Sequence, residues 1–156
     1  MLDHFSIQCA DVAASAAFYD AALAPLGGTR VMDFGEVIGF GVPPKPEFWI
    51  GPRTTGEGFR ESHIAFTAPD RAAVRAFFQA AVDAHAEVLH EPRLWPEYHA
   101  GYYGAFVRDP DGNNVEAVCH WNSGYQHQSQ GGQSSWIMSR CSVSALLCRP
   151  PSGTGR

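Results

Sequence analysis

Two stretches of the sequence, HFSIQCADVAASAAFYDAAL at residues 4–23 and HIAFTAPDRAAVRAFFQAAV at residues 63–82, match at a constant offset of 59 residues. Each begins with a histidine and a short alternating run, which is typical of a half-buried strand. Seven residues later stands an aspartate, Asp11 or Asp70, whose carboxylate can cap the N-terminus of a helix. An apolar stripe then repeats on both predicted helices. The sequence therefore predicts a strand–helix unit that occurs twice.

Strand-like runs follow each helix, so each half is predicted to be β-α-β-β-β. Pro25, Gly27 and Gly28 are expected to stop the first helix, and the second is expected to end near residues 85–87. The predicted strands cover residues 29–34, 36–41, 48–51, 86–90, 102–108 and 114–120. A hairpin turn with the sequence Asp-Pro-Asp-Gly-Asn, residues 109–113, joins the last two strands. A longer insertion, residues 91–101, lies in the second half.

The fold class predicted from this repeat is α+β, with two βαβββ modules at about residues 2–52 and 60–121. Together they form a single domain over residues 1–122. The remaining segment, residues 123–156, is rich in Ser, Gly and Gln and has no counterpart in the repeat. Its composition indicates a mostly disordered tail, in which residues 136–138 and 143–148 are the apolar patches.

Composition and charge exclude several classes of function. The 156-residue chain has a net charge of −5 and no basic cluster, which argues against binding to a nucleic-acid backbone. No apolar run approaches the roughly 20 residues of a membrane span, and the N-terminus shows no secretory signal. The four cysteines, Cys9, Cys119, Cys141 and Cys148, form no CxxC pair and are interpreted as thiols of a cytoplasmic protein. No nucleophile–base set and no phosphate loop stands out.

The repeated strand histidines, the helix motif at residues 15–20 and the residue 109–113 turn followed by Glu116 resemble the vicinal-oxygen-chelate (VOC) superfamily. This superfamily includes glyoxalase I, type I extradiol dioxygenases, fosfomycin-resistance enzymes and bleomycin-binding proteins. The resemblance covers about residues 2–121. It implies that each module curls its sheet into half of an open cup with the helices outside, and that the chain pairs into a homodimer.

The resemblance also implies a metal site at the first and last strands of the modules. Carried over to this sequence, the ligands are His4, His63 and Glu116. The fourth ligand position aligns with Trp49, which departs from glyoxalase I, and Glu47 could take that place only with a two-residue shift of register. Two imidazoles and a carboxylate with open coordination positions suit Fe, Mn, Ni or Zn in their divalent states. Such a metal can chelate two adjacent oxygens of a small-molecule substrate.

Each of these residues also has a simpler interpretation. His4 and His63 could be strand histidines that bind no metal. Glu116 could form a salt bridge, with Arg53, Arg60 and Arg93 as the candidate partners. Around the metal, Glu116 and Tyr103 are the expected catalytic residues, and the substrate pocket is predicted to include Gln8, Trp49, Trp95 and Tyr102. The alternative for these aromatic residues is ordinary packing.

Three functions are therefore weighed. The first is a metal-dependent enzyme, either a lyase or isomerase or a dioxygenase, that acts on a small vicinal-oxygen substrate. The second is a metal-free protein of the bleomycin-resistance kind that sequesters an apolar or aromatic ligand. The third is a copy of the fold with only a structural role, because fold does not imply function.

Overall fold

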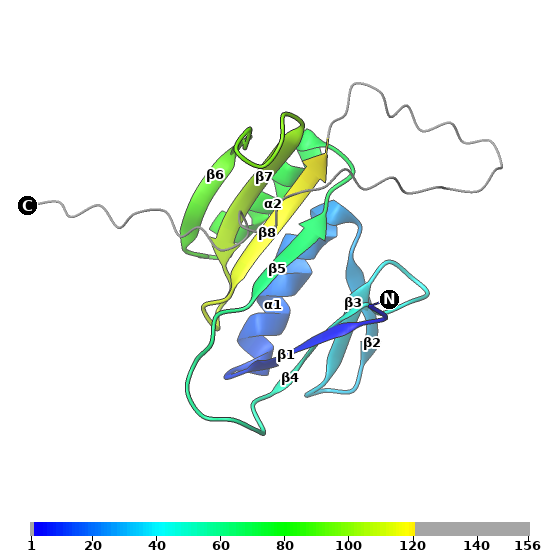
Figure 1. Ribbon diagram of the computed structural model, residues 1–156. Helices are drawn as coiled ribbons and strands as arrows, with labels where there is room; N and C mark the ends of the chain where they lie inside the picture. The colour runs from blue at the N-terminus through cyan, green and yellow to red at the C-terminus, as the bar shows by residue number, and fades with distance from the viewer. Residues whose placement is uncertain (1, 121–156) are drawn as a thin grey trace, which may run out of the picture. The chain divides into compact units, whose positions relative to one another are not determined.

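The computed structural model describes residues 2–120, which lie within one compact unit. Figure 1 shows two successive modules, each with one strand, one helix and then three strands. The elements of the first module are β1 (Phe5–Cys9), α1 (Val12–Leu23), a 3₁₀ turn (Ala24–Leu26), β2 (Thr29–Asp33), β3 (Ile38–Gly41) and β4 (Phe48–Pro52). Those of the second are β5 (His63–Thr67), α2 (Arg71–Asp83), β6 (Val88–Leu94), β7 (Tyr102–Arg108) and β8 (Asn114–His120). The predicted α+β fold with two βαβββ modules is confirmed.

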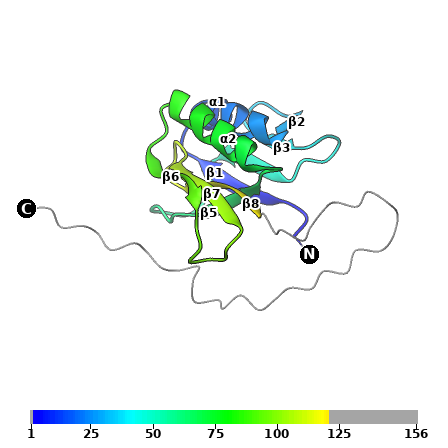
Figure 2. The same cartoon turned by 90° about the horizontal axis from the view of Figure 1, so that it is seen from above.

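Each module forms its own mixed sheet. The strand orders are β1-β4-β3-β2 and β5-β8-β7-β6, and the two sheets do not close into a barrel. In each sheet the first and last strands are parallel and the other pairs are antiparallel. The two helices contact each other and cover one side of the sheets, as Figure 2 shows. Among residues 2–120, no helix covers the opposite side of either sheet, which is called the open side below.

The hydrophobic core lies between the helices and the sheets. The helix stripe predicted from the sequence supplies it: Tyr19, Phe77 and Ala81 are fully buried. Val115 and Ala117 of β8 meet this layer from the sheet. Because side chains alternate along a strand, their neighbours Asn114, Glu116 and Val118 face the open side.

The helix caps follow the prediction at three of four ends. Asp11 and Asp70 accept hydrogen bonds from the amides of Ala14 and Ala73, at 2.9 and 2.8 Å. Gly27, with a φ of 83°, stops the turn that follows α1. The second helix, however, ends at Asp83, two residues before the predicted range. His85 has a φ of 63° and ends α2 in the left-handed conformation that Gly27 adopts after α1. Residues other than glycine adopt this conformation rarely, so no sequence pattern predicted it.

The predicted insertion at residues 91–101 is partly wrong, because β6 extends through Leu94. Pro92 weakened the strand signal, since proline cannot donate to a sheet ladder. It is tolerated because β6 is an edge strand whose register shifts between His90 and Arg93. Only the segment from Trp95 to Gly101 forms the loop between β6 and β7.

The strand register confirms that Trp49 and Glu116 are equivalent. Trp49 pairs with Ser6 of β1, and Glu116 pairs with Ala65 of β5. Ser6 and Ala65 are themselves equivalent, because they are separated by the 59-residue offset of the repeat. Glu47 lies before β4, where its carbonyl accepts from the Phe5 amide. No shift of register therefore brings Glu47 to the position of Glu116.

The turn at residues 109–113 connects the two modules through its carboxylates. Asp111 Oδ1 accepts from the Ala10 amide at 2.6 Å, and its Oδ2 accepts from Ser15 Oγ at 2.8 Å. Asp109 accepts from Tyr19 Oη at 2.7 Å and from the amides of Asp111 and Asn113. The turn therefore holds the end of β1 and the start of α1.

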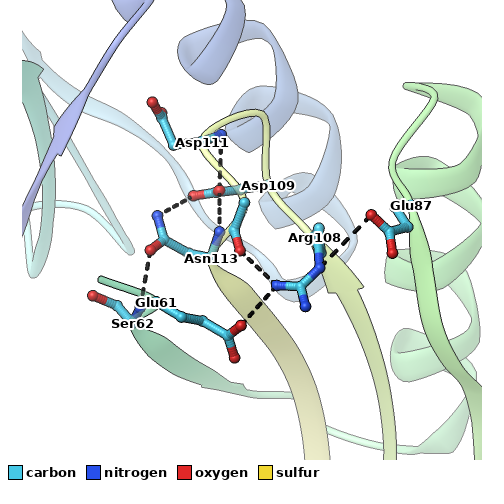
Figure 3. A network of polar contacts seen from close by, with 8 residues as sticks. Glu61, Ser62, Glu87, Arg108, Asp109, Asp111 and Asn113 are labelled. Atoms are coloured by element: carbon cyan, nitrogen blue, oxygen red, sulfur yellow. Dashed lines mark hydrogen bonds and ion pairs between the residues drawn. The ribbon is translucent and has the colours of Figure 1, made fainter. Parts of the chain in front are cut away.

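Figure 3 shows how the same turn is anchored within its own module. Asn113 donates to Asp109 and accepts from the Ser62 amide. Arg108 donates to Glu61 at 2.9 Å and to the Gly112 carbonyl at 2.6 Å. Gly112 has a φ of 88°, which confirms the predicted requirement for glycine.

Two further predictions concern cysteines and membranes. Cys9 and Cys119 are buried free thiols, and burial raises the pKa of Cys9 to about 12. Cys141, Cys148 and the predicted tail lie outside the described residues. No helix within residues 2–120 is long and apolar enough to cross a membrane.

We expect Tyr19→Phe to lower the free energy of unfolding by about 1–2 kcal/mol, because it removes one of the two side-chain donors to Asp109 Oδ2 and leaves only Asn113 Nδ2. The ring that packs in the core is retained, so the loss reports the hydrogen bond. Urea denaturation of both proteins at pH 7 measures it. An unchanged midpoint would show that the contact between Tyr19 and Asp109 contributes nothing to stability.

Candidate functional site

The open side of the second sheet brings together three polar side chains from three strands. Glu116 of β8 lies between His63 of β5 and Tyr102 of β7. His63 Nε2 is 3.0 Å from Glu116 Oε2, and Tyr102 Oη donates to Glu116 Oε1 at 2.5 Å. We name His63, Glu116 and Tyr102 the carboxylate cluster.

Strand register explains why these side chains meet. Residues 63 and 65 of β5 share a face with 114 and 116 of β8, and Tyr102 shares that face with His120. Gly104 on β7 makes room for the carboxylate: a Cβ atom there would lie 2.9 Å from Glu116 Oε1 and 3.3 Å from Tyr102 Cε1. Glycine is required at position 104 because the Glu116 carboxylate approaches the backbone there too closely for a side chain. The backbone φ of Gly104 is one that other residues can also adopt.

The Glu116 carboxylate is buried, and no lysine or arginine among residues 2–120 forms an ion pair with it. The Glu116 side chain is 2% exposed, whereas that of His63 is 42% exposed. Within residues 2–120, the ion pairs of Glu116 include no arginine or lysine, and Arg93 pairs with Glu97 instead. The salt-bridge alternative for Glu116 is therefore wrong for Arg93, and neither Arg53 nor Arg60 pairs with it. A buried carboxylate held only by neutral donors and a histidine is typical of functional sites.

Tyr102 is held on the sheet by aromatic neighbours. Its ring packs against Tyr98, His99 and His120, with centroid separations of 4.9, 5.4 and 5.1 Å. Burial and the hydrogen bond to Glu116 raise the pKa of Tyr102, so its hydroxyl remains protonated at neutral pH. Tyr102 is therefore a hydrogen-bond donor to Glu116.

His99 and His120 connect the β6–β7 loop to the end of β8. His99 Nε2 lies 3.0 Å from His120 Nδ1, and the Gly101 amide donates to His99 Nδ1 at 3.2 Å. Because Nδ1 of His99 accepts, the neutral ring carries its proton on Nε2 and donates it to His120. Burial and the neighbouring His99 lower the pKa of His120, which favours its neutral form.

His4 lies apart from the carboxylate cluster. It precedes β1, its side chain is 58% exposed, and its Nδ1 is 2.9 Å from Asp3 Oδ1. Within residues 2–120 no three side chains of His, Cys, Asp or Glu come close enough to hold one metal ion. The structure thus brings together His63 and Glu116 of the three predicted ligands.

Tyr103 and Gln8 lie elsewhere than the sequence analysis expected. Tyr103 faces the helix layer, where the Arg71 guanidinium lies 5.1 Å from its ring centroid, because it alternates with Tyr102 along β7. Gln8 accepts from the amides of Thr54 and Thr55 and donates to Thr55 Oγ1. Its amide fixes the linker that follows β4.

The two predicted pocket tryptophans occupy different sheets. Trp49 lies on the first sheet across Gly39, with its ring parallel to that of Phe34 at 6.5 Å. Trp95 belongs to the second sheet and is buried, with its Nε1 donating to the Gly104 carbonyl at 3.1 Å. Arg93 covers the Trp95 ring at 3.3 Å from the centroid. Trp95 also packs edge-on against Phe106, which shares the sheet face of Gly104 and Glu116.

Comparison with known proteins agrees with this architecture. The family model of the Glyoxalase/Bleomycin resistance protein/Dioxygenase superfamily matches residues 1–117. The chain belongs to this superfamily. No curated protein is similar enough to the chain to count as a relative.

Several solved structures share the fold of this superfamily member. A glyoxalase/bleomycin resistance protein from Albidiferax ferrireducens is 26% identical, with a TM-score of 0.65, and the match covers 74% of this chain and 95% of that one. A lactoylglutathione lyase from Agrobacterium tumefaciens is 23% identical, with a TM-score of 0.54, over 74% and 90% of the two chains. A superfamily enzyme from Burkholderia phytofirmans is 20% identical, with a TM-score of 0.56, over 75% and 96%.

Members of the superfamily often bind a divalent metal. The spacing of the donor atoms in the carboxylate cluster shows whether its residues fit one. Two atoms bound to one metal at about 2.1 Å and at a right angle lie about 3 Å apart. His63 Nε2 and Glu116 Oε2 are 3.0 Å apart, and both are donors that such metals accept. These two residues fit a metal ion. His4 is the predicted ligand that the structure does not place beside them.

Stability should fall as the pH decreases below the ordinary histidine value of 6.5, because His90 and His120 both have lowered pKa values. The unfolded chain then binds protons that the folded chain resists. Urea denaturation at pH 5.5, 7 and 8 measures the effect, and His120→Asn should reduce the difference between pH 5.5 and 8. An undiminished difference in this variant would contradict the role assigned to His120.

Proposed function

We propose that the protein is a metal-dependent enzyme that acts on a small substrate with two adjacent oxygens. The observation that carries the proposal is the buried Glu116 carboxylate, which lies 3.0 Å from His63 Nε2 on the open sheet face. His63 and Glu116 are the proposed ligands of Fe, Mn, Ni or Zn in the divalent state, and His4 is the proposed third ligand. The dioxygenase alternative fits this donor set better, because the lyase or isomerase alternative departs from glyoxalase I at Trp49.

The chain's own residues prepare this site. Tyr102 occupies Oε1 of Glu116, which leaves Oε2 directed toward His63. When bound, a divalent metal would polarise the oxygens of the substrate. Phe106 packs edge-on against the His63 ring, with the two ring centroids 6.0 Å apart. Glu116 thus acts by binding, and Tyr102 positions it.

The test is metal content in protein purified without added metal or chelator. We expect about one equivalent per chain in the wild type and a strong loss in His63→Ala and Glu116→Gln, since each removes a ligand. Glu36→Gln, at an exposed position on another module, is the matched control. His4→Ala measures the third ligand separately: unchanged content would remove His4 from the site without removing the metal.

Absence of metal from the wild type, even after reconstitution with Fe(II), Mn(II), Ni(II) and Zn(II), would reject the proposal. Where metal is found, α-oxoaldehydes and catechols are the first substrates to assay. Activity that survives removal of the metal by a chelator would also contradict a metal-dependent mechanism.

Tyr102→Phe should weaken metal affinity by about 10- to 100-fold, because outer partners orient the ligand carboxylate. Tyr103→Phe is a close control, as it makes the same change one residue away on the opposite face of β7. Competition with a chromophoric chelator measures both affinities. An equal or larger loss of metal affinity in Tyr103→Phe would contradict the positioning role assigned to Tyr102.

A metal-free binding protein is the second candidate. The parallel rings of Phe34 and Trp49 favour it, because Phe34 is 72% exposed and offers an aromatic surface on the first sheet. It predicts binding of a planar aromatic ligand that a chelator does not affect and that Trp49→Ala abolishes. The family resemblance further supports a homodimer, which sedimentation of the full chain would test.

A further inference from the structure

One polar atom on the open face of the second sheet has no partner. Oδ1 of Asn114 is buried and accepts no hydrogen bond within residues 2–120. A buried polar group without a partner costs free energy comparable to a lost hydrogen bond, so native proteins leave few of them. Such an atom requires an explanation in terms of a ligand, an ordered water or a functional role.

Asn114 lies next to the carboxylate cluster. It is the first residue of β8, two positions before Glu116, and its side chain therefore shares the face of Glu116. In the parallel pairing of β5 with β8 it stands in register with His63. The unpaired oxygen thus belongs to the strand position beside the two proposed metal ligands.

The protein's own donors near Asn114 are engaged elsewhere. Arg108 is its cross-strand partner on β7, but the guanidinium donates to Glu61 and to the Gly112 carbonyl. The imidazole of His63 has its Nε2 at Glu116. The donor that satisfies Asn114 must therefore come from outside these side chains.

We propose that Asn114 is a specificity-determining residue whose Oδ1 accepts a hydrogen bond from a hydroxyl group of the substrate. This inference rests on the proposed function, because it places the substrate beside His63 and Glu116. A site with an acceptor built for a hydroxyl rejects an analogue that lacks it, since the acceptor is then left unpaired. The substrate class is narrowed to molecules that carry a hydroxyl donor next to the metal-binding oxygens.

The thermal midpoint distinguishes a substrate-binding role of Asn114 from a structural role. Asn114→Leu keeps the branched shape and removes the unpaired oxygen, so the thermal midpoint should stay the same or rise. A bound water that satisfied the amide would make Asn114 structural, and the same variant would then lower the midpoint. Thr67→Val makes a comparable polar-to-apolar change on the same face of β5, away from residue 63, and is the control.

The binding experiment uses pyrogallol and catechol with the full chain as purified, followed by titration calorimetry, because pyrogallol carries one more hydroxyl beside the two oxygens that would bind the metal. The wild type should prefer pyrogallol, and Asn114→Leu should reduce this preference about tenfold, because a lost hydrogen bond is of that order. Thr67→Val should keep the preference. His63→Ala should lose binding of both probes through loss of the proposed metal ligand.

The outcomes distinguish the two proposals. Binding that depends on His63 but is equal in wild type and Asn114→Leu would overturn the role of Asn114 and leave the proposed function standing. A lowered thermal midpoint for Asn114→Leu would overturn it as well. Failure of the wild type to bind either probe would overturn the inference about Asn114, whereas the proposed function is rejected separately, by absence of metal from the wild type.

Discussion

The architecture depends on the carboxylates of the turn between β7 and β8. Asp111 bonds to the Ala10 amide and the Ser15 hydroxyl, where β1 ends and α1 begins, and Asp109 accepts from Tyr19 within α1. These contacts join residues 90 to 101 positions apart in the chain, and two of them are buried or partly buried. Because the last strand is held in this way against the first module, the face of β8 is presented in one orientation.

The same position in the two modules serves two different purposes. Trp49 and Glu116 are equivalent in strand register, yet Trp49 covers Gly39 with an indole whereas Glu116 directs a carboxylate toward His63. A duplicated unit can therefore specialise one sheet for polar chemistry while the other offers an aromatic surface. The asymmetry needs only a few substitutions, because side chains on the open faces do not determine the shared core.

Burial of the Glu116 carboxylate costs free energy, and its neighbours on the second sheet offset that cost. Gly104 leaves the space, Tyr102 donates to one oxygen, and His63 approaches the other. The loop from Trp95 to Gly101 then encloses Tyr102 through aromatic contacts and the pair of His99 and His120. Removing one partner would leave a charge in a poorly hydrated place, which explains why the cluster spans three strands.

The sequence by itself determined the repeat, the βαβββ order, the helix caps and the turn at residues 109–113, because each depends on local periodicity or on a residue's own backbone preference. The family resemblance also singled out His63 and Glu116, which the structure brings within hydrogen-bond distance of each other. The end of α2 at Asp83, ahead of a left-handed His85, and the extension of β6 past Pro92 were missed, because both are exceptions that tertiary context permits. Only the tertiary structure decided that Tyr102 rather than Tyr103 meets Glu116, that Gly104 makes room for it, and that His4 lies apart. Those relations depend on which face of a strand is open and on distances between strands, which no local pattern in a single chain encodes.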